Sequence, residues 1–204
     1  MFTKRSTRVT VMLLGALVAA LAILVALAPE ALGQEVGAAR ERNIAVEIAE
    51  NGTRFVPDET PADEEGHPAY GTEFITEGYI YPAGTLTCVD NECNGVLDDG
   101  SPEFPDLVLG QWHCFGWHVG EGAQTTTGPW VVSTQIFDFG DTPGAMTVVT
   151  QGYEYSDFNV AFLRAITGGT GQHRNAGGEQ TQEFLGWNPS LGAALRVVLS
   201  LNVR

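Results

Sequence analysis

The chain of 204 residues is poor in basic side chains. Ten Lys and Arg stand against 25 Asp and Glu, which gives a formal net charge of −15, and beyond Arg8 every basic residue is an arginine. A nucleic-acid-binding surface needs a basic stripe that displaces phosphate counterions, and adsorption to anionic lipid needs a similar charge. The scarcity of basic residues therefore disfavours both partners, and the acidity is typical of a highly soluble protein.

The chain also lacks long amphipathic segments, because after residue 33 no extended run shows the 3.6-residue apolar period of a helix. Instead, 25 glycines separate short segments that are rich in apolar and β-branched residues. This pattern is typical of strands joined by turns. The chain after residue 33 is long enough for one domain with a substantial core, so a single all-β domain is predicted.

The N-terminal residues 1–33 carry a targeting pattern. Three basic residues precede an uncharged apolar run over residues 9–29, and small residues lie three and one positions before Gln34. This predicts a secretory signal peptide, although the run is also long enough for an uncleaved anchor. Either outcome places the remaining chain outside the cytoplasm, secreted or extracytoplasmic, with membrane contact only if the segment is retained. Cleavage would leave seven basic and 24 acidic residues, a net charge of −17, and a flexible leader at residues 34–42.

Eight segments within residues 43–204 have strand patterns. The first, residues 43–50, alternates cleanly, and the last, residues 195–203, places Leu and Val on one face. Six more lie between them, at residues 73–86, 111–119, 130–139, 145–155, 158–167 and 176–187. Eight strands predict a closed antiparallel β-barrel, with a β-sandwich as the alternative. The barrel is favoured because the last strand is too apolar for an exposed edge.

Three cysteines, Cys88, Cys93 and Cys114, lie in or near an acidic insertion at residues 89–105. Because exported proteins enter an oxidising compartment, we expect a disulfide bond between two of these cysteines. A bridge from Cys88 or Cys93 to Cys114 is favoured, because it would fix the insertion to the third strand, and a Cys88–Cys93 bridge is the alternative. The insertion loosely resembles a calcium loop, but Ser101 stands where a bidentate glutamate is needed. A solvated acidic turn is therefore preferred, and no metal site is expected.

Residues 162–179 indicate a strand, a glycine corner and a second strand. The corner glycines permit positive φ angles and close backbone approach, and they are Gly168, Gly169 and Gly171. The segment Ala-Ile-Thr-Gly-Gly-Thr-Gly at residues 165–171 resembles the matching loop of allene oxide cyclases and of plant dirigent proteins. The likeness to allene oxide cyclases continues through residues 137–141 and 151–153. Both families are closed eight-stranded antiparallel barrels with a ligand cavity, so the resemblance implies the same fold here.

The first strand offers a candidate catalytic residue, Glu47. An eight-stranded lumen can hold one small ligand, so polar side chains that face it are the candidate catalysts. Ala45 and Ala49 share the face of Glu47 and would leave room beside its carboxylate, which could then act as a general acid or base. The resemblance implies the same role, since allene oxide cyclases have a functional pocket glutamate there. If this face points inward, the apolar opposite face needs cover, which predicts a homo-oligomer.

Three further side chains are candidate ligand-binding residues. Arg164 lies among apolar residues on one strand face and either binds a ligand carboxylate or pairs with a neighbouring Glu. Arg196 lies opposite an apolar face and has the same two interpretations. Tyr153, at the end of the fifth predicted strand, either lines the pocket mouth or packs there. His173, just after the glycine corner, is interpreted as a surface turn residue.

Two functions follow from the resemblance. The first is an exported isomerase, an intramolecular cyclase of the allene oxide cyclase type, in which the barrel folds a small apolar substrate and excludes water. The second is a dirigent-like protein or a non-catalytic carrier or envelope protein that binds a small apolar ligand in the same cavity. Allene oxide cyclases have a water-holding asparagine where this chain has Ala49, which favours binding without turnover. Neither hypothesis requires a cofactor.

Overall fold

The computed structural model describes residues 40–57, 68–119 and 125–203. The predicted signal segment, residues 1–33, and most of the leader lie outside the described residues. Within them the domain has eight long strands and three strands of two residues each. The long strands are β1 (Arg40–Glu50), β3 (Glu73–Pro82), β6 (Gly110–His118), β7 (Pro129–Phe139), β8 (Thr147–Tyr155), β9 (Phe162–Gly169), β10 (Gly177–Trp187) and β11 (Ala193–Val203), and the short ones are β2 (Val56–Pro57), β4 (Cys88–Val89) and β5 (Glu92–Cys93).

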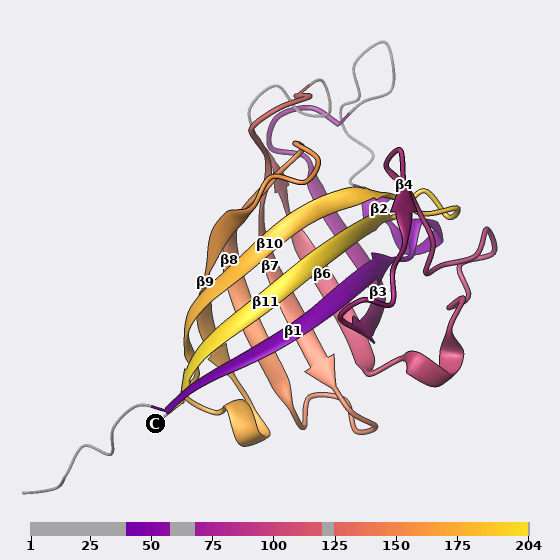
Figure 1. Ribbon diagram of the computed structural model, residues 1–204. Helices are drawn as coiled ribbons and strands as arrows, with labels where there is room; N and C mark the ends of the chain where they lie inside the picture. Colours follow the sequence, from indigo (N-terminus) through magenta and orange to yellow (C-terminus); the bar gives the residue numbers. More distant parts are fainter. Residues whose placement is uncertain (1–39, 58–67, 120–124, 204) are drawn as a thin grey trace, which may run out of the picture. The chain divides into compact units, whose positions relative to one another are not determined.

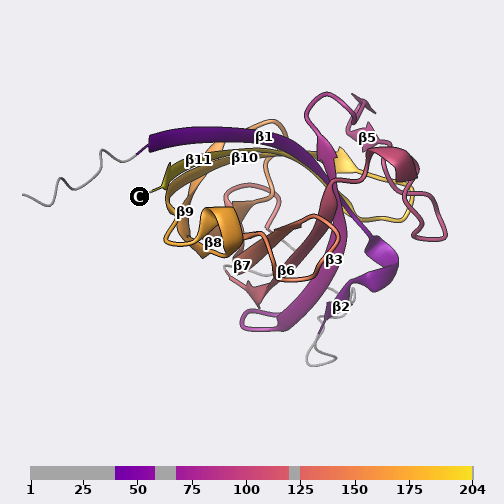
Figure 2. The ribbon, with the colours of Figure 1, turned by 90° about the horizontal axis from the view of Figure 1, so that it is seen from below.

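The eight long strands close into a barrel. Their order around it is β11–β1–β3–β6–β7–β8–β9–β10, and antiparallel pairing of β10 with β11 closes the ring. Figure 1 shows the strands crossing the barrel at a tilt, and Figure 2 shows them from below, wrapped around one axis. The prediction of a closed eight-stranded antiparallel barrel is confirmed, and the predicted strands match the observed ones to within a few residues. Among the described residues, no helix is long and apolar enough to span a membrane.

The last strand, β11, forms part of the interior wall as its pattern predicted. Leu195, Val197, Leu199 and Leu201 are at most 3 % exposed and belong to the barrel core. β11 has no exposed edge, because β1 pairs with it on one side and β10 on the other. Closure therefore satisfies the backbone of the most apolar strand and buries its side chains in one step.

The predicted orientation of β1 is wrong. Val46, Ile48 and Glu50 face the barrel interior, whereas Glu47 and Ala49 face outward. The outward face is buried too, because the insertion that follows β3 packs over it and forms a second apolar cluster. The chain itself thus covers both faces of this half of β1. A homo-oligomer is therefore not needed to cover the outer face of this strand, and oligomer formation remains a prediction.

The insertion is held by a short hairpin of β4 and β5 and by contacts to β3. A disulfide joins Cys88 to Cys93, which lie opposite each other in this hairpin. The favoured pairing with Cys114 is therefore wrong, and Cys114 is a buried free thiol on the inward face of β6. The hydroxyl of Tyr81 donates a hydrogen bond to the carbonyl oxygen of Gly95 at 2.8 Å. The disulfide is typical of an oxidising, extracytoplasmic compartment.

The glycine corner joins β9 to β10 as predicted. Gly171 has a φ of +58°, and a Cβ atom there would lie 2.2 Å from the carbonyl oxygen of Ala145. Only glycine permits this approach, so the corner packs directly on the segment that leads into β8. The interpretation of His173 as a surface residue is wrong: it is 2 % exposed, and its ring lies beside that of Phe139.

Candidate functional site

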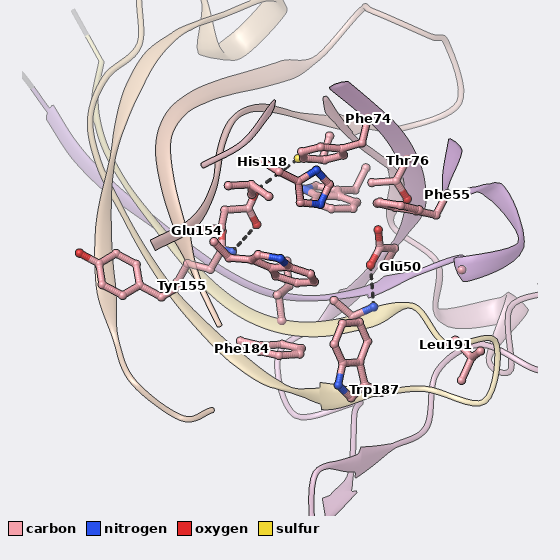
Figure 3. A pocket seen from close by; sticks show the side chains of 18 residues that line it. Glu50, Phe55, Phe74, Thr76, His118, Glu154, Tyr155, Phe184, Trp187 and Leu191 are labelled. Carbon is pink, nitrogen blue, oxygen red and sulfur yellow. Dashed lines mark hydrogen bonds between the residues drawn. The ribbon is translucent and has the colours of Figure 1, made fainter. Parts of the chain in front are cut away.

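A cavity of about 300 Å³ lies inside the barrel. It lies toward the end at which β1, β6, β8 and β10 finish, since their last residues or those near them line it. Its volume is at the lower end of the range for small-molecule pockets. Aromatic rings form much of the wall (Figure 3), contributed by Phe55, Phe74, Trp112, Trp130, Tyr155, Phe184 and Trp187. Such a wall accommodates a small, largely apolar molecule.

The aromatic rings hold one another in place across the strands. Phe55, which follows the short turn after β1, stacks on Phe74 with ring centroids 5.7 Å apart. Trp187 contacts Trp130 and Phe184 edge to face, at 5.9 and 5.0 Å. Ring pairs in these geometries stabilise by about 0.5–1.5 kcal/mol each beyond the area that they bury. The wall is therefore preformed by contacts between strands that are distant in the sequence.

Glu50, the last residue of β1, lines this cavity (Figure 3). It is 8 % exposed, and its Oε2 accepts a hydrogen bond from the backbone amide of Ala193 at 2.6 Å. Burial raises the pKa of Glu50 from 4.5 to about 7, although the Ala193 amide and the Thr76 hydroxyl oppose the shift, and the charge of Glu154 adds to it. A large share of Glu50 is therefore protonated at neutral pH and can donate a proton.

Glu154, near the end of β8, is the second carboxylate of the cavity and is held in the opposite state. Its Oε1 lies 3.6 Å from Nη1 of Arg164 and accepts hydrogen bonds from the Ser133 hydroxyl and the Cys114 thiol. Its Oε2 accepts from Nε2 of Gln182 at 3.0 Å. Burial alone would raise the pKa of Glu154, but the Arg164 charge and these hydrogen bonds outweigh it and lower the pKa. Glu154 is therefore ionised at neutral pH.

Arg164 points inward from β9 and supports Glu154 from behind the cavity wall. Its Nη2 donates to the carbonyl oxygen of Ser133 and its Nη1 to that of Tyr153, both at 3.0 Å. Gly152 faces the stem of the arginine, where a Cβ atom would lie 3.3 Å from it. Of the two interpretations of Arg164, the geometry favours the pair with a neighbouring Glu. Arg164 is not among the residues that line the cavity.

The arrangement provides a proton donor and a fixed negative charge in one apolar space. Two titratable groups whose environments push their pKa values apart are typical of acid–base sites. Cys114 contributes a neutral thiol, because burial raises its pKa well above the ordinary value. No Lys or Arg is among the residues that line this cavity. Within the part of the chain that the structure describes, no group of His, Cys, Asp and Glu could hold a metal ion.

The other three predicted site residues lie outside the cavity. Glu47 points outward, where its Oε2 accepts a hydrogen bond from the Leu86 amide at 2.7 Å. Arg196 is on the same outer wall, 3.8 Å from Glu47 and in an ion pair with Glu183 at 2.9 Å. Tyr153 is 53 % exposed. The prediction that Glu47 faces the lumen is therefore wrong. Of the two interpretations of Arg196, the geometry favours the pair with a neighbouring Glu. Tyr153 is not among the residues that line the cavity.

We expect the Glu47→Gln variant to keep the cavity and its ligand binding, because the side chain only anchors the insertion to the outer wall. Glutamine retains an acceptor for the Leu86 amide but loses the charge, which costs about 1 kcal/mol of unfolding free energy. Urea denaturation measures this loss, and a ligand titration measures the retained binding. A clear loss of ligand affinity in a folded Glu47→Gln protein would contradict this assignment.

The sequence analysis missed the residues that do line the cavity: Glu50, His118 and Glu154. One signal was available, because Glu50 shares the strand face of Val46 and Ile48. If the face with Val46 and Ile48 is taken as the interior, Glu50 is predicted to face the lumen near one end of the barrel. No comparable signal existed for Glu154, whose inward position depends on its contacts with β7, β9 and β10.

Solved structures with this fold include two dirigent proteins. No protein-family model matches the chain, and no curated protein sequence matches it. The chain is similar to the pterocarpan synthase dirigent protein GePTS1, with 13% identity and a TM-score of 0.55 over 84% of this chain and 95% of that one. It is similar to PsPTS1, another such protein, with 14% identity and a TM-score of 0.55 over 81% and 97%. The barrel thus has the same fold as these dirigent proteins, one of the two families that the glycine corner resembles.

Proposed function

We propose that this protein binds a small, neutral, largely apolar molecule inside the barrel and isomerises or cyclises it by acid catalysis. The observation that carries the proposal is Glu50, a buried carboxyl group whose pKa of about 7 lets it donate a proton into an aromatic cavity. We place this activity outside the cytoplasm, in keeping with the Cys88–Cys93 disulfide. We assign to Glu50 the role of general acid that the sequence had suggested for Glu47.

The cavity walls would do the positioning. Trp112, Trp130 and Phe184 give the substrate flat apolar surfaces that fold it and exclude water, so that its reacting atoms meet in one orientation. Glu50 would transfer its proton to a basic atom of the substrate as bonds rearrange. Glu154 stays ionised, and its charge helps keep Glu50 protonated before the transfer.

The fold is compatible with this chemistry. Two of the similar structures are named pterocarpan synthase dirigent proteins, and that name describes the synthesis of a product by a protein of the same fold. At 13–14% identity the likeness concerns the fold, so the proposal depends on the cavity of this chain and on Glu50.

The second candidate is a carrier that binds the same class of molecule without turnover. The hydrogen bonds of Glu154 favour it, because Arg164, Ser133, Gln182 and Cys114 already occupy the carboxylate. On this hypothesis Glu154 is a structural group and Glu50 only adjusts the polarity of the cavity. Mass spectrometry of molecules extracted from the purified protein would identify the bound ligand or product, and loss of turnover in Glu50→Gln would select the enzyme.

Binding itself can be measured without knowing the natural ligand. We expect the neutral fluorescent probe N-phenyl-1-naphthylamine to bind and quench tryptophan emission, and the anionic anilinonaphthalene sulfonate to bind more weakly. Replacing Ala193, which lines the cavity, with leucine should weaken binding of the neutral probe roughly tenfold, or about 1.4 kcal/mol. Leu163→Ala on the outer wall is the matched control. Equal affinity for both probes, or tight binding by Ala193→Leu, would contradict a neutral ligand in this cavity.

A further inference from the structure

His118, the last residue of β6, is a titratable group of the cavity to which the proposed function has so far given no role. It is 1 % exposed and lines the cavity beside Glu50 and Glu154 (Figure 3). Its ring is fixed by two edge-on contacts, to Phe74 at 5.4 Å and to Trp130 at 6.1 Å between ring centroids. The imidazole is therefore a rigid part of the wall.

One hydrogen bond determines which ring nitrogen of His118 carries the proton. Nδ1 lies 3.3 Å from the backbone carbonyl oxygen of Thr72. A carbonyl oxygen only accepts hydrogen bonds, so Nδ1 must be the protonated nitrogen in this contact. In the neutral ring Nε2 then carries a lone pair and acts as an acceptor. Burial lowers the pKa of His118, which keeps the ring neutral at neutral pH.

We propose that Nε2 of His118 is the proton acceptor of this cavity, opposite in role to the proton donor Glu50. This inference rests on the proposed function and gives it a substrate class: neutral compounds with a proton made acidic by a conjugated carbonyl group. His118 takes the proton from the substrate and becomes an imidazolium, while Glu50 delivers its proton to another atom of the conjugated system and becomes a carboxylate. The substrate keeps its composition, and proton exchange through water restores both side chains.

The remaining titratable groups of the cavity do not compete for this role. Glu154 on β8 is occupied by hydrogen bonds and by Arg164, and the Cys114 thiol on β6 donates to it. Tyr155 on β8 also lines the cavity, but its ring and hydroxyl point away from Glu50 and His118 (Figure 3).

Nitrogen-15 NMR of the histidine side chains tests the tautomer without any ligand. We expect His118 to be neutral at pH 7, with the proton on Nδ1, because burial lowers its pKa. A proton on Nε2, or a charged His118 at pH 7, would overturn the proposal.

Proton acceptance is tested with 2-naphthol, which becomes a strong acid when excited, and with 2-methoxynaphthalene, which has no proton to give. Bound 2-naphthol should emit as naphtholate in the native protein and in Glu50→Gln. In His118→Phe it should bind within about threefold of the native affinity but emit only as naphthol. Naphtholate emission that persists in His118→Phe overturns the proposal. If neither probe binds the native protein, the proposed function fails, while the NMR result still decides the tautomer.

Discussion

Replacing Arg164 with methionine is expected to lower the free energy of unfolding by about 3–5 kcal/mol at neutral pH. The Arg164 side chain is fully buried and lies 3.6 Å from Glu154, whose side chain is only 13% exposed. Methionine fills a similar volume but leaves that carboxylate, and the carbonyl oxygens of Ser133 and Tyr153, without their positively charged donor. Removal of one partner from a buried ion pair is far more costly than removal of the whole pair.

The same substitution at Arg54 is the matched control. Arg54 forms an ion pair of 3.0 Å with Glu77, and its side chain is 62% exposed. Exposed pairs contribute about 0–1 kcal/mol, so Arg54→Met should change unfolding in urea very little. Adding Glu154→Gln to Arg164→Met should recover part of the lost stability, because the unpaired charge is then removed. Equal losses of stability from Arg164→Met and Arg54→Met would contradict the assignment of Arg164 to a buried ion pair.

The closed barrel was predictable because the apolar residues of the last strand need a sheet without an exposed edge. β11 alternates over its whole length and is too apolar for an exposed edge, so a closed barrel is the arrangement that buries it. The corner after β9 was also predictable, because a cluster of glycines follows an apolar, β-branched run, and one of them, Gly171, has a positive φ. Both features are local or periodic, and such features are present in the sequence itself.

The candidate site was not predictable in the same way. On β1 both faces of the second half are buried, so alternation identifies two faces but not which one is interior. Glu47 was chosen because small residues flank it, yet that room is filled by Leu86 and by residues of the insertion. The disulfide has a similar origin, since the pairing of Cys88 with Cys93 follows from a hairpin that the sequence did not indicate.

Glu154 and His118 show what sequence patterns leave out. Glu154 becomes a low-pKa carboxylate only when Arg164, Ser133 and Gln182, from three other strands, meet it inside the barrel. His118 acquires its tautomer from the carbonyl of Thr72, a residue just before β3. These properties depend on contacts between distant segments, so they appear only when the strand register is known.

The Glu50→Gln variant is expected to be more stable than the native protein at pH 8, by about 3 kcal/mol. The native fold raises the pKa of Glu50 from 4.5 to about 7. Between these pH values the folded protein binds a proton that the unfolded chain has released. The contribution of Glu50 to the free energy of unfolding is therefore fully present below pH 4.5 and decreases as the pH rises to about 7. Above pH 7 the loss is complete, and an uncharged glutamine does not incur it while its oxygen can still accept from the Ala193 amide.

Measuring unfolding in urea from pH 4 to 8 separates this effect from those of the other carboxylates. The difference in unfolding free energy between native protein and Glu50→Gln should grow with pH between about 4.5 and 7 and then level off. Glu183→Gln on the outer wall is the control for the loss of one acidic side chain. A stability difference independent of pH would mean that Glu50 titrates normally and cannot serve as the proton donor. If Glu50→Gln is more stable than the native protein but cannot turn over a substrate, Glu50 is a catalytic group that lowers the stability of the fold. Functional residues often have this property, whereas structural residues stabilise the fold.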